Sequence, residues 1–258
     1  MALSRPRGAG CGSGGVTKMT TGPAQLHVLI SGGFSGPYER LLPEFTRTSG
    51  IKVATGSGAS QGSGPQTIAA QLARGMPADV VILSREGLAE LIAASRILAG
   101  TDVDLARVGL GVAVRSGTQK PDVRTAEAFK QVLLEAKTVA VPESTSGIWL
   151  LTDLFPRLGI AGKLSIKAAP RGTDATRMVA AGDTDLAVMP VSEILHARGV
   201  DFAGSIAPEI QFMQTFSAAV VAGSQQVEGS KRLIELLASA RAAEAIRTSG
   251  MVPLTTSR

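Results

Sequence analysis

Short apolar runs alternate with amphipathic stretches along almost the whole chain, and this alternation constrains the fold more than any other feature. Strands that are each followed by a helix build a parallel sheet whose faces the helices cover. The predicted strands are residues 26–30, 51–54, 79–83, 109–114, 138–141, 165–168, 186–189 and 215–221. The predicted helices, with apolar residues at spacings of three and four, are 37–49, 65–74, 86–94, 125–136, 148–157, 173–181 and one or two within 227–248. The chain is therefore predicted to be an α/β protein.

Two runs, 107–116 and 215–223, are apolar on both faces and bordered by Gly or polar residues. We interpret them as crossings between two lobes. The predicted organisation is a leader over 1–24, a first lobe of 25–108 plus 218–258, and a second lobe of 109–217. Open α/β sheets bind ligands outside the carboxyl ends of their strands, so a cleft is expected at the hinge.

Composition bears mainly on which partners are excluded. Of the 258 residues, 44% are hydrophobic and 18% charged, enough apolar content for a full core. Aromatic residues make up only 3%, so few rings can stack on bases, and the net charge of +5 is spread over single basic residues. We expect no nucleic-acid partner, and weak steering of anions at most. No window of about twenty apolar residues predicts a membrane span.

The first 22 residues contain Arg, Gly and the single Cys11, without the apolar stretch of a secretory or lipoprotein signal. The chain as written is expected in the cytoplasm. A start further upstream than Met1 would instead allow a periplasmic protein, and Met19 is an alternative start within the chain.

The strongest local signals are two Ser/Gly turns that each join a predicted strand to a helix. One is Ser31-Gly32-Gly33, and the other is Ser144-Thr145-Ser146-Gly147. The first backbone N–H groups of a helix lack partners within it and carry partial positive charge, so such turns can hold an anion. An ordinary helix cap explains either turn alone. Two of them, over a hundred residues apart, predict two lobes that grip one small carboxylate or oxyanion.

Further polar residues follow other predicted strands and are expected at the same sheet edges. Each also has a simpler explanation, as a helix cap, a flexible loop or a surface charge. An arginine at such an edge can bind a carboxylate through two parallel hydrogen bonds. The additional ligand-binding candidates are Ser35, Ser60, Ser84, Arg85, Arg171 and Ser192.

Familiar catalytic and cofactor motifs are missing from the sequence. The two histidines, His27 and His196, have no nucleophile elbow with triad partners in a suitable order. There is no phosphate-binding Gly-x-x-x-x-Gly-Lys-Ser/Thr loop, and no His/Cys cluster with metal-ligand spacing. We therefore expect no metal and no cofactor.

The residues carry a resemblance to a known family. The runs LHVLISGG at 26–33, LPEF at 42–45, SGIKV at 49–53, QLARGMPADVV at 71–81 and STSG at 144–147 resemble type II periplasmic solute-binding proteins of the molybdate-binding kind. The resemblance covers the chain from residue 25 to the end. It implies the two-lobed Venus-flytrap fold, with a helix-covered, mostly parallel sheet in each lobe and the ligand cleft at the hinge.

Within this family the chain is most similar to a branch that includes the bacterial aconitate isomerases. That similarity rests on residues 31–33, PQTI at 65–68, Asp122 with AFK at 128–130, Ser144 with 146–147, LFPR at 154–157 and SE at 192–193. The one tyrosine, Tyr38, lies in the first predicted helix. A second-lobe tyrosine, which the molybdate pocket has, is absent.

The resemblance implies an isomerase that moves the double bond of a small unsaturated tricarboxylate by proton transfer. Such a reaction needs carboxylate anchors and an acid/base group near the reacting carbon. The candidate proton carriers are Glu143 and Glu193, with His196 a weaker third. The alternative is a non-catalytic binding protein that delivers an organic acid or oxyanion to the permease of an ABC transporter.

Overall fold

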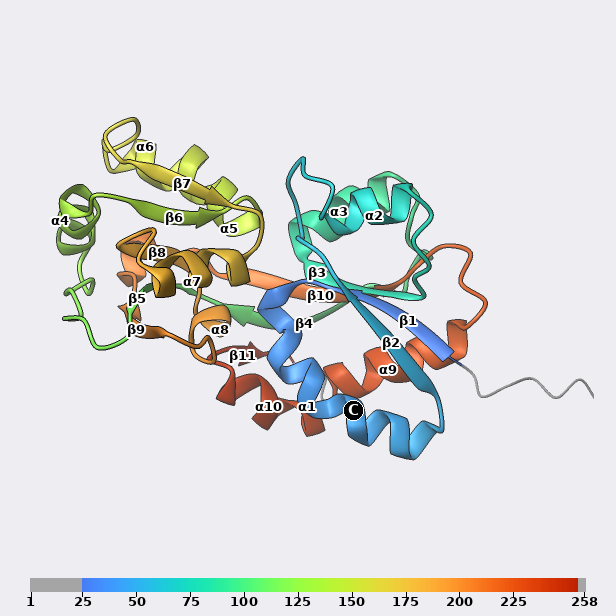
Figure 1. The fold of residues 1–258 in the computed structure, drawn as a ribbon. Helices are drawn as coiled ribbons and strands as arrows, with labels where there is room; N and C mark the ends of the chain where they lie inside the picture. Colours follow the sequence, from blue (N-terminus) through green and yellow to red (C-terminus); the bar gives the residue numbers. More distant parts are fainter. Residues whose placement is uncertain (1–24, 255–258) are drawn as a thin grey trace, which may run out of the picture.

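The computed structural model describes residues 25–254, and it contains two separate β-sheets joined at a hinge (Figure 1). The first sheet has the strand order β11-β4-β10-β3-β1-β2, and the second has the order β7-β6-β8-β5-β9. The strands are β1 (Gln25–Ile30), β2 (Lys52–Ser57), β3 (Val80–Ser84), β4 (Val103–Val108), β5 (Leu110–Arg115), β6 (Val139–Pro142), β7 (Ile166–Ala169), β8 (Leu186–Pro190), β9 (Val200–Ser205), β10 (Gln214–Val220) and β11 (Val252–Pro253). We call each sheet with its covering helices a lobe.

Helices cover both faces of each sheet. They are α1 (Ser35–Ser49), α2 (Ile68–Ala73), α3 (Arg85–Ala93), α4 (Ala126–Glu135), α5 (Thr145–Trp149), α6 (Phe155–Arg157), α7 (Gly172–Ala181), α8 (Val191–Ile194), α9 (Val227–Ala238) and α10 (Ala243–Thr248). A π-helical turn, Leu150–Leu154, joins α5 to α6. Short 3-10 turns occupy Gly32–Phe34, Pro208–Ile210 and Ala240–Ala242.

Strand β1 shows how the first lobe is layered. Its side chains alternate between the two faces of the sheet. Leu26 and Val28 pack in a core with residues of α1, α9 and α10, whereas Leu29 packs on the opposite face in a core with residues of α2 and α3. Burial of apolar surface on both faces explains why β3, in the middle of this sheet, is apolar at nearly every position.

The second lobe repeats this three-layer arrangement. Phe129 and Leu133 of α4 pack on one face of the sheet together with the large apolar residues of the segment 150–155. On the other face, small side chains such as Ala140 and Ala187 leave room for α7 and α8 to approach closely. Each lobe therefore has a hydrophobic core on either side of its sheet.

The chain passes between the sheets twice. The first crossing needs one residue, Gly109, between β4 and β5, and the second uses residues 206–213 between β9 and β10. Gln211 ties the crossings together: its Oε1 accepts from Leu110 N at 2.7 Å, and its Nε2 donates to Leu110 O at 3.0 Å. Strand β10 returns from the cleft side, so it runs antiparallel to β3 and β4, while β2-β1-β3 and β7-β6-β8 are parallel.

The predicted α/β fold is confirmed, and all eight predicted strands are present within a few residues. Strands β4, β9 and β11 were not predicted. Charged or polar residues interrupt their apolar pattern, as in β4 with Asp104 and Arg107, because these strands are partly exposed. The second predicted helix begins later than expected, at Ile68, where the Thr67 side chain accepts a hydrogen bond from Ala70 N and caps it.

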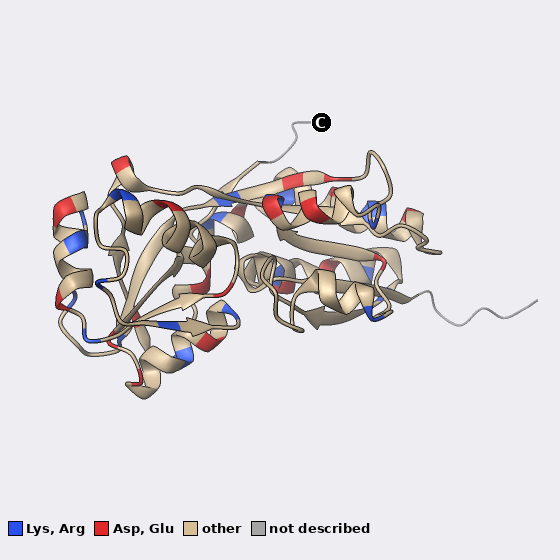
Figure 2. Ribbon diagram, turned by 90° about the horizontal axis from the view of Figure 1, so that it is seen from above, with Lys and Arg blue, Asp and Glu red and all other residues tan. Residues whose placement is uncertain are grey.

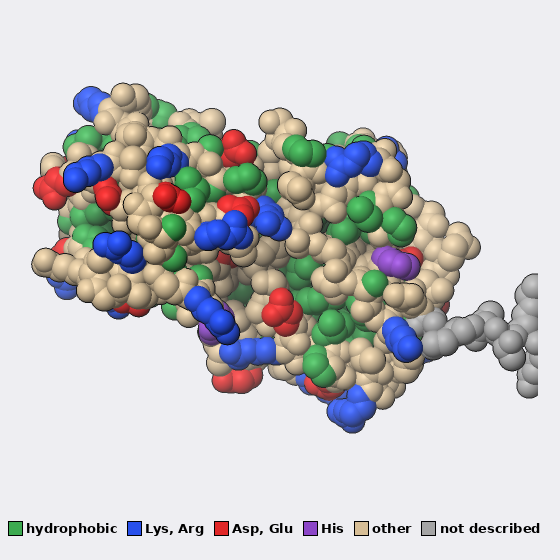
Figure 3. All heavy atoms as spheres, in the orientation of Figure 1, with side chains coloured by type: hydrophobic (Ala, Val, Ile, Leu, Met, Phe, Trp, Pro, Cys, Tyr) green, Lys and Arg blue, Asp and Glu red, His purple; other side chains and the backbone are tan. Residues whose placement is uncertain are grey.

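Charged side chains are distributed over the helices and loops of both lobes, with basic and acidic residues interspersed (Figure 2). The face in Figure 3 shows the same mixture, with basic groups singly or in small sets. Within residues 25–254, no helix is long and apolar enough to span a membrane. The predicted leader and Cys11 lie outside the described residues.

Candidate functional site

A small cavity lies between the two lobes, where the carboxyl ends of several strands face each other. About 20 Å³ of space remains inside it, which is room for a single water-sized molecule. Both lobes and the returning strand β10 contribute to its wall. The lining residues are Ser31, Gly32, Gly58, Ala59, Ser60, Pro142, Ser144, Ser146, Arg171, Gly172, Pro190, Glu193, Gln214 and Phe216. The lobes are therefore closed on one another.

The first predicted turn forms part of this wall. Ser31 follows β1, and its backbone N–H donates to Ile82 O of β3 at 2.8 Å. The Ser31 side chain is buried, and its Oγ has no hydrogen-bond partner among the described residues. Gly33 is required for packing, because a Cβ there would lie 2.0 Å from the Phe216 ring. Ser31 thus presents a free hydroxyl at the cavity.

The Gly/Ser stretch after β2 supplies the next part of the wall. Ser60 is buried, and its Oγ accepts from Ser84 N at 2.9 Å, which fixes this loop to the end of β3. Gly58 lies so close to Gln71 and Ile68 that a Cβ there would meet both within 2.8 Å. The loop is therefore packed in place, and its serine is part of the candidate site.

The second predicted turn faces the first from the other lobe. Ser144 and Ser146 line the cavity, while Thr145 points toward the first lobe. The hydroxyls of Ser84 and Thr145 are 2.7 Å apart, and both residues are buried. Gln61 N donates weakly to Ser144 Oγ at 3.4 Å. These bonds join the lobes directly.

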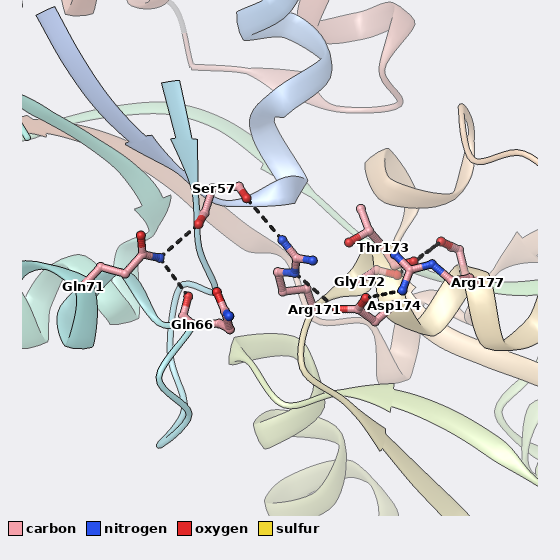
Figure 4. Close-up of polar contacts among 9 residues, drawn as sticks. Ser57, Gln66, Gln71, Arg171, Gly172, Thr173, Asp174 and Arg177 are labelled. Atoms are coloured by element: carbon pink, nitrogen blue, oxygen red, sulfur yellow. Dashed lines mark hydrogen bonds and ion pairs between the residues drawn. The ribbon is translucent and has the colours of Figure 1, made fainter. Parts of the chain in front are cut away.

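Arg171 makes a further polar bridge between the lobes (Figure 4). Its Nη1 donates to Ser57 Oγ at 3.2 Å, and its Nε donates to Asp174 Oδ2 at 3.2 Å. Asp174 also accepts from Arg177 at 2.8 Å. Arg171 directly precedes α7, so its guanidinium lies beside the positive end of that helix dipole. It is the one Lys or Arg among the lining residues and the natural partner for a carboxylate.

Glu193 is the acidic group of the cavity. It lies in α8, and glycines flank its carboxyl group on both sides: Oε2 would be 2.7 Å from a Cβ on Gly32 and 1.9 Å from one on Gly172. The residue keeps some exposure, but atoms of both lobes enclose its carboxyl group. This burial raises the pKa of Glu193 to about 7, and the nearby positive charge of Arg171 opposes the rise.

The structure brings about half of the predicted residues together in one cavity: Ser31, Gly32, Ser60, Ser144, Ser146, Arg171 and Glu193. Four others do not line the cavity but hold its wall in place. Ser84 and Thr145 bond to each other, and Gly33 and Gly147 are close-packed against Phe216 and Pro142. Ser192 has a buried Oγ without a partner among the described residues, but it does not line the cavity.

Three of the predicted residues lie away from the cavity. Arg85 is bound by two aspartates, with Nη1 2.7 Å from Asp102 Oδ2 and Nε 2.7 Å from Asp104 Oδ1, so its charge is already paired. Ser35 Oγ donates to Gly32 O at 2.8 Å inside its own turn. Glu143 has an exposed side chain and is not a lining residue. Of the two predicted proton carriers, Glu193 alone is enclosed.

Sequence reasoning missed Gln214, Phe216, Gly172, Pro142 and Pro190. Pro142, Gly172 and Pro190 lie at or just after the carboxyl ends of β6, β7 and β8, beside residues that were predicted. Gln214 and Phe216 lie at the start of β10, which is antiparallel, so its first residues reach the cavity edge. The polar Gln214 immediately before the apolar run of β10 was the available signal. Among the described residues, no group of three or more His, Cys, Asp or Glu side chains is placed to hold a metal ion.

Comparison with known proteins agrees with this architecture. A sequence profile of the family described as bacterial extracellular solute-binding protein matches residues 26–252. The aconitate isomerase of a Pseudomonas species is 37% identical over 234 residues, which are 89% of this chain and 88% of that protein.

Two solved structures show the same fold at low sequence identity. The periplasmic molybdate-binding protein of Azotobacter vinelandii is 20% identical with a TM-score of 0.68, over 88% of this chain and 98% of that one. The sulfate-binding protein SubI of Mycobacterium tuberculosis is 22% identical with a TM-score of 0.70, over 90% of this chain and 87% of that one.

Proposed function

The chain belongs to the family of bacterial extracellular solute-binding proteins, and within this family we propose that it is an enzyme, an aconitate isomerase that works in the cleft between its lobes. The observation that carries the proposal is the carboxyl group of Glu193, enclosed by both lobes with a pKa near neutrality. The relative with aconitate isomerase activity, 37% identical over most of both chains, supports it.

The cavity wall suits a small polycarboxylate. Arg171 provides a cation, and Ser31, Ser60, Ser144 and Ser146 provide hydroxyl donors from both lobes. Hydrogen bonds to a charged group are stronger than those between neutral groups. Because the donors come from two lobes, a bound tricarboxylate would hold the lobes together.

Glu193 can perform the proton transfer alone. Its carboxylate removes a proton from the CH₂ carbon of aconitate, and the C–H electron pair spreads over the three-carbon system and its carboxylate oxygens. The protonated Glu193 then returns the proton to the carbon on the other side of the central one, where the double bond had ended. One C–H bond breaks, one forms, and the double bond moves by one position. Arg171 and the serine hydroxyls would stabilise the negative charge of the intermediate.

A pKa of about 7 fits this task. A catalytic acid/base works best when its pKa lies near the operating pH, because both forms are then accessible. An exposed glutamate, with a pKa near 4.5, would be too weak a base for a carbon acid. Burial between Gly32 and Gly172 is what makes Glu193 more basic.

The direct test is conversion of trans-aconitate by the purified protein, followed by NMR in D₂O. We expect the cis isomer to appear, with deuterium entering the flanking carbons as Glu193 exchanges its proton with solvent. If the protein converts nothing and instead binds another anion tightly, it is a solute-binding protein of a transporter, and the isomerase proposal is wrong.

Replacing Arg171 with Met should weaken tricarboxylate binding by about 10- to 100-fold, since hydrogen bonds to charged groups contribute about 1.5–3 kcal/mol. The positive charge of Arg171 holds down the pKa of Glu193, so its loss should raise that pKa. The midpoint at which kcat/KM rises with pH should therefore move above that of the wild type. Steady-state kinetics over a pH series measures both effects.

Arg177→Met is the matched control, because Arg177 pairs with the same Asp174 on α7 but is exposed and outside the cavity. It should leave the affinity and the pH midpoint unchanged. Equal effects of the two substitutions would mean that Arg171 acts through Asp174 and not through the ligand or Glu193.

A further inference from the structure

Gln214 is a buried polar residue with no assigned role in the chemistry above. It lines the cavity, and the residue is 3% exposed. Its Oε1 has no hydrogen-bond partner among the described residues. Buried side-chain amides are nearly always bonded, so an unpaired one in a ligand cavity points to a ligand as its partner.

The position of Gln214 differs from that of the serines. It is the first residue of β10 and pairs with Val108, the last residue of β4. Both residues lie where the chain crosses between the lobes, so Gln214 sits at the hinge floor of the cavity. The Ser31 turn and the 144–147 turn lie on the walls, one in each lobe.

The reaction treats the three carboxylates of aconitate differently. A proton leaves one flanking carbon and arrives at the other, so these two carbons exchange their sp³ and sp² geometry. The central carbon stays sp² throughout, and its carboxylate keeps its place. A group on a hydrogen-bonded strand moves little, and it can hold the central carboxylate without opposing the reaction.

We propose, on the basis of the function proposed above, that Gln214 is a specificity-determining residue whose side-chain amide donates a hydrogen bond to the carboxylate on the central carbon of the substrate. Rotation of the amide about its last bond exchanges its oxygen and nitrogen, so an N–H takes the place of the unpaired Oε1. The two terminal carboxylates then reach the two walls. A neutral amide suits this place because Glu193 must alternate between charged and neutral forms nearby.

The test compares two saturated ligands that differ only in the central carboxylate, tricarballylate and glutarate. Calorimetry of wild type and Gln214→Leu gives the four dissociation constants. We expect Gln214→Leu to weaken the binding of tricarballylate by about 10-fold or more and the binding of glutarate by less than about 2-fold. With aconitate, KM should rise while kcat changes little, because the contact is equally strong in substrate and transition state.

Gln71→Leu is the matched control. Gln71 is also buried, but its Nε2 is already bonded, to Ser57 O at 3.0 Å and Gln66 O at 3.1 Å (Figure 4). Gln71→Leu should lower the melting temperature and change the dissociation constants of both ligands by the same factor. Gln214→Leu removes an unpaired group, so it should leave the melting temperature unchanged or raised. If this variant does not fold, Gln214→Glu makes the same comparison by placing a carboxylate against the central one.

If Gln214→Leu weakens the binding of both ligands equally, or of neither, the inference is overturned and the isomerase proposal still stands. Wild type that binds tricarballylate but converts no aconitate overturns the isomerase proposal, while the ligand comparison still decides the role of Gln214. A wild type that binds neither ligand overturns both.

Discussion

Replacing Glu193 with Gln is expected to lower kcat/KM for aconitate by about 10²- to 10⁴-fold, the usual contribution of a general acid/base. Gln keeps the shape of the side chain between Gly32 and Gly172 but can neither accept nor return a proton. Binding of tricarballylate should be as tight or tighter at pH 8, because a negative charge that opposes the carboxylates has been removed. Steady-state kinetics and calorimetry on the same preparation measure the two effects.

The pH dependence of the wild type gives a second view of the same group. In the proposed mechanism the free enzyme needs Glu193 as a carboxylate, so kcat/KM should rise with pH through about 7, the pKa that burial gives this residue. The matched control for Glu193→Gln is Glu143→Gln. The Glu143 side chain is exposed outside the cavity, so this variant should retain full activity. Loss of activity in Glu143→Gln with retention in Glu193→Gln would reverse the assignment of the proton carrier.

Unfolding does not explain the expected loss in Glu193→Gln. The folded-state pKa is raised to about 7 from the ordinary 4.5, so the folded protein keeps this proton where the unfolded chain has lost it. The contribution of Glu193 to the free energy of unfolding is therefore largest below pH 4.5 and falls as the pH rises to about 7. Gln lacks this dependence, and at pH 8 the variant should be at least as stable as the wild type.

Replacing Gly147 with Ala is expected to destabilise the protein by about 3 kcal/mol or more. The new Cβ would lie 1.7 Å from Pro142 O, a backbone atom that cannot move without displacing the end of β6. Overpacking in a tight interior typically costs about 1–3 kcal/mol, and a clash with backbone belongs at the upper end. In a chain of this size the melting temperature should fall by roughly 10 °C. Thermal unfolding followed by circular dichroism measures it.

Gly64→Ala is the control for this substitution. Gly64 lies in the Gly/Ser loop of the first lobe, nothing approaches its Cβ position within 4 Å, and its backbone is outside the left-handed region. Its melting temperature should stay within about 2 °C of the wild type, as for other surface changes. If Gly147→Ala has the same melting temperature as Gly64→Ala, the turn at 142–147 is looser than the close approach to Pro142 O indicates.

The order of strands and helices could be predicted because buried strands are apolar at nearly every position and helices repeat their apolar residues regularly. β3 and β8 are of this kind, and both are entirely buried. β4 and β9 could not be found in this way. They carry polar residues on partly exposed faces, and what holds them is pairing with β10 and β5, which are distant in sequence.

The site could be predicted only where a residue's place along the chain determines its place in space. Ser31, Ser144 and Ser146 follow parallel strands, so they reach the cavity edge as expected. Arg85 also follows such a strand, but its guanidinium is bound by Asp102, just before β4, and by Asp104 on β4. No local sequence pattern indicates that contact. The difference between Glu143 and Glu193 is likewise burial by the opposite lobe, which sequence does not reveal.

The small volume of the cavity between the lobes also limits the turnover rate. About 20 Å³ admits no tricarboxylate, so the lobes must part to take up each substrate and again to free each product. Parting breaks the bonds from Ser84 to Thr145 and from Arg171 to Ser57. In the proposed mechanism, kcat cannot exceed the rate at which the lobes separate, however fast Glu193 transfers its proton.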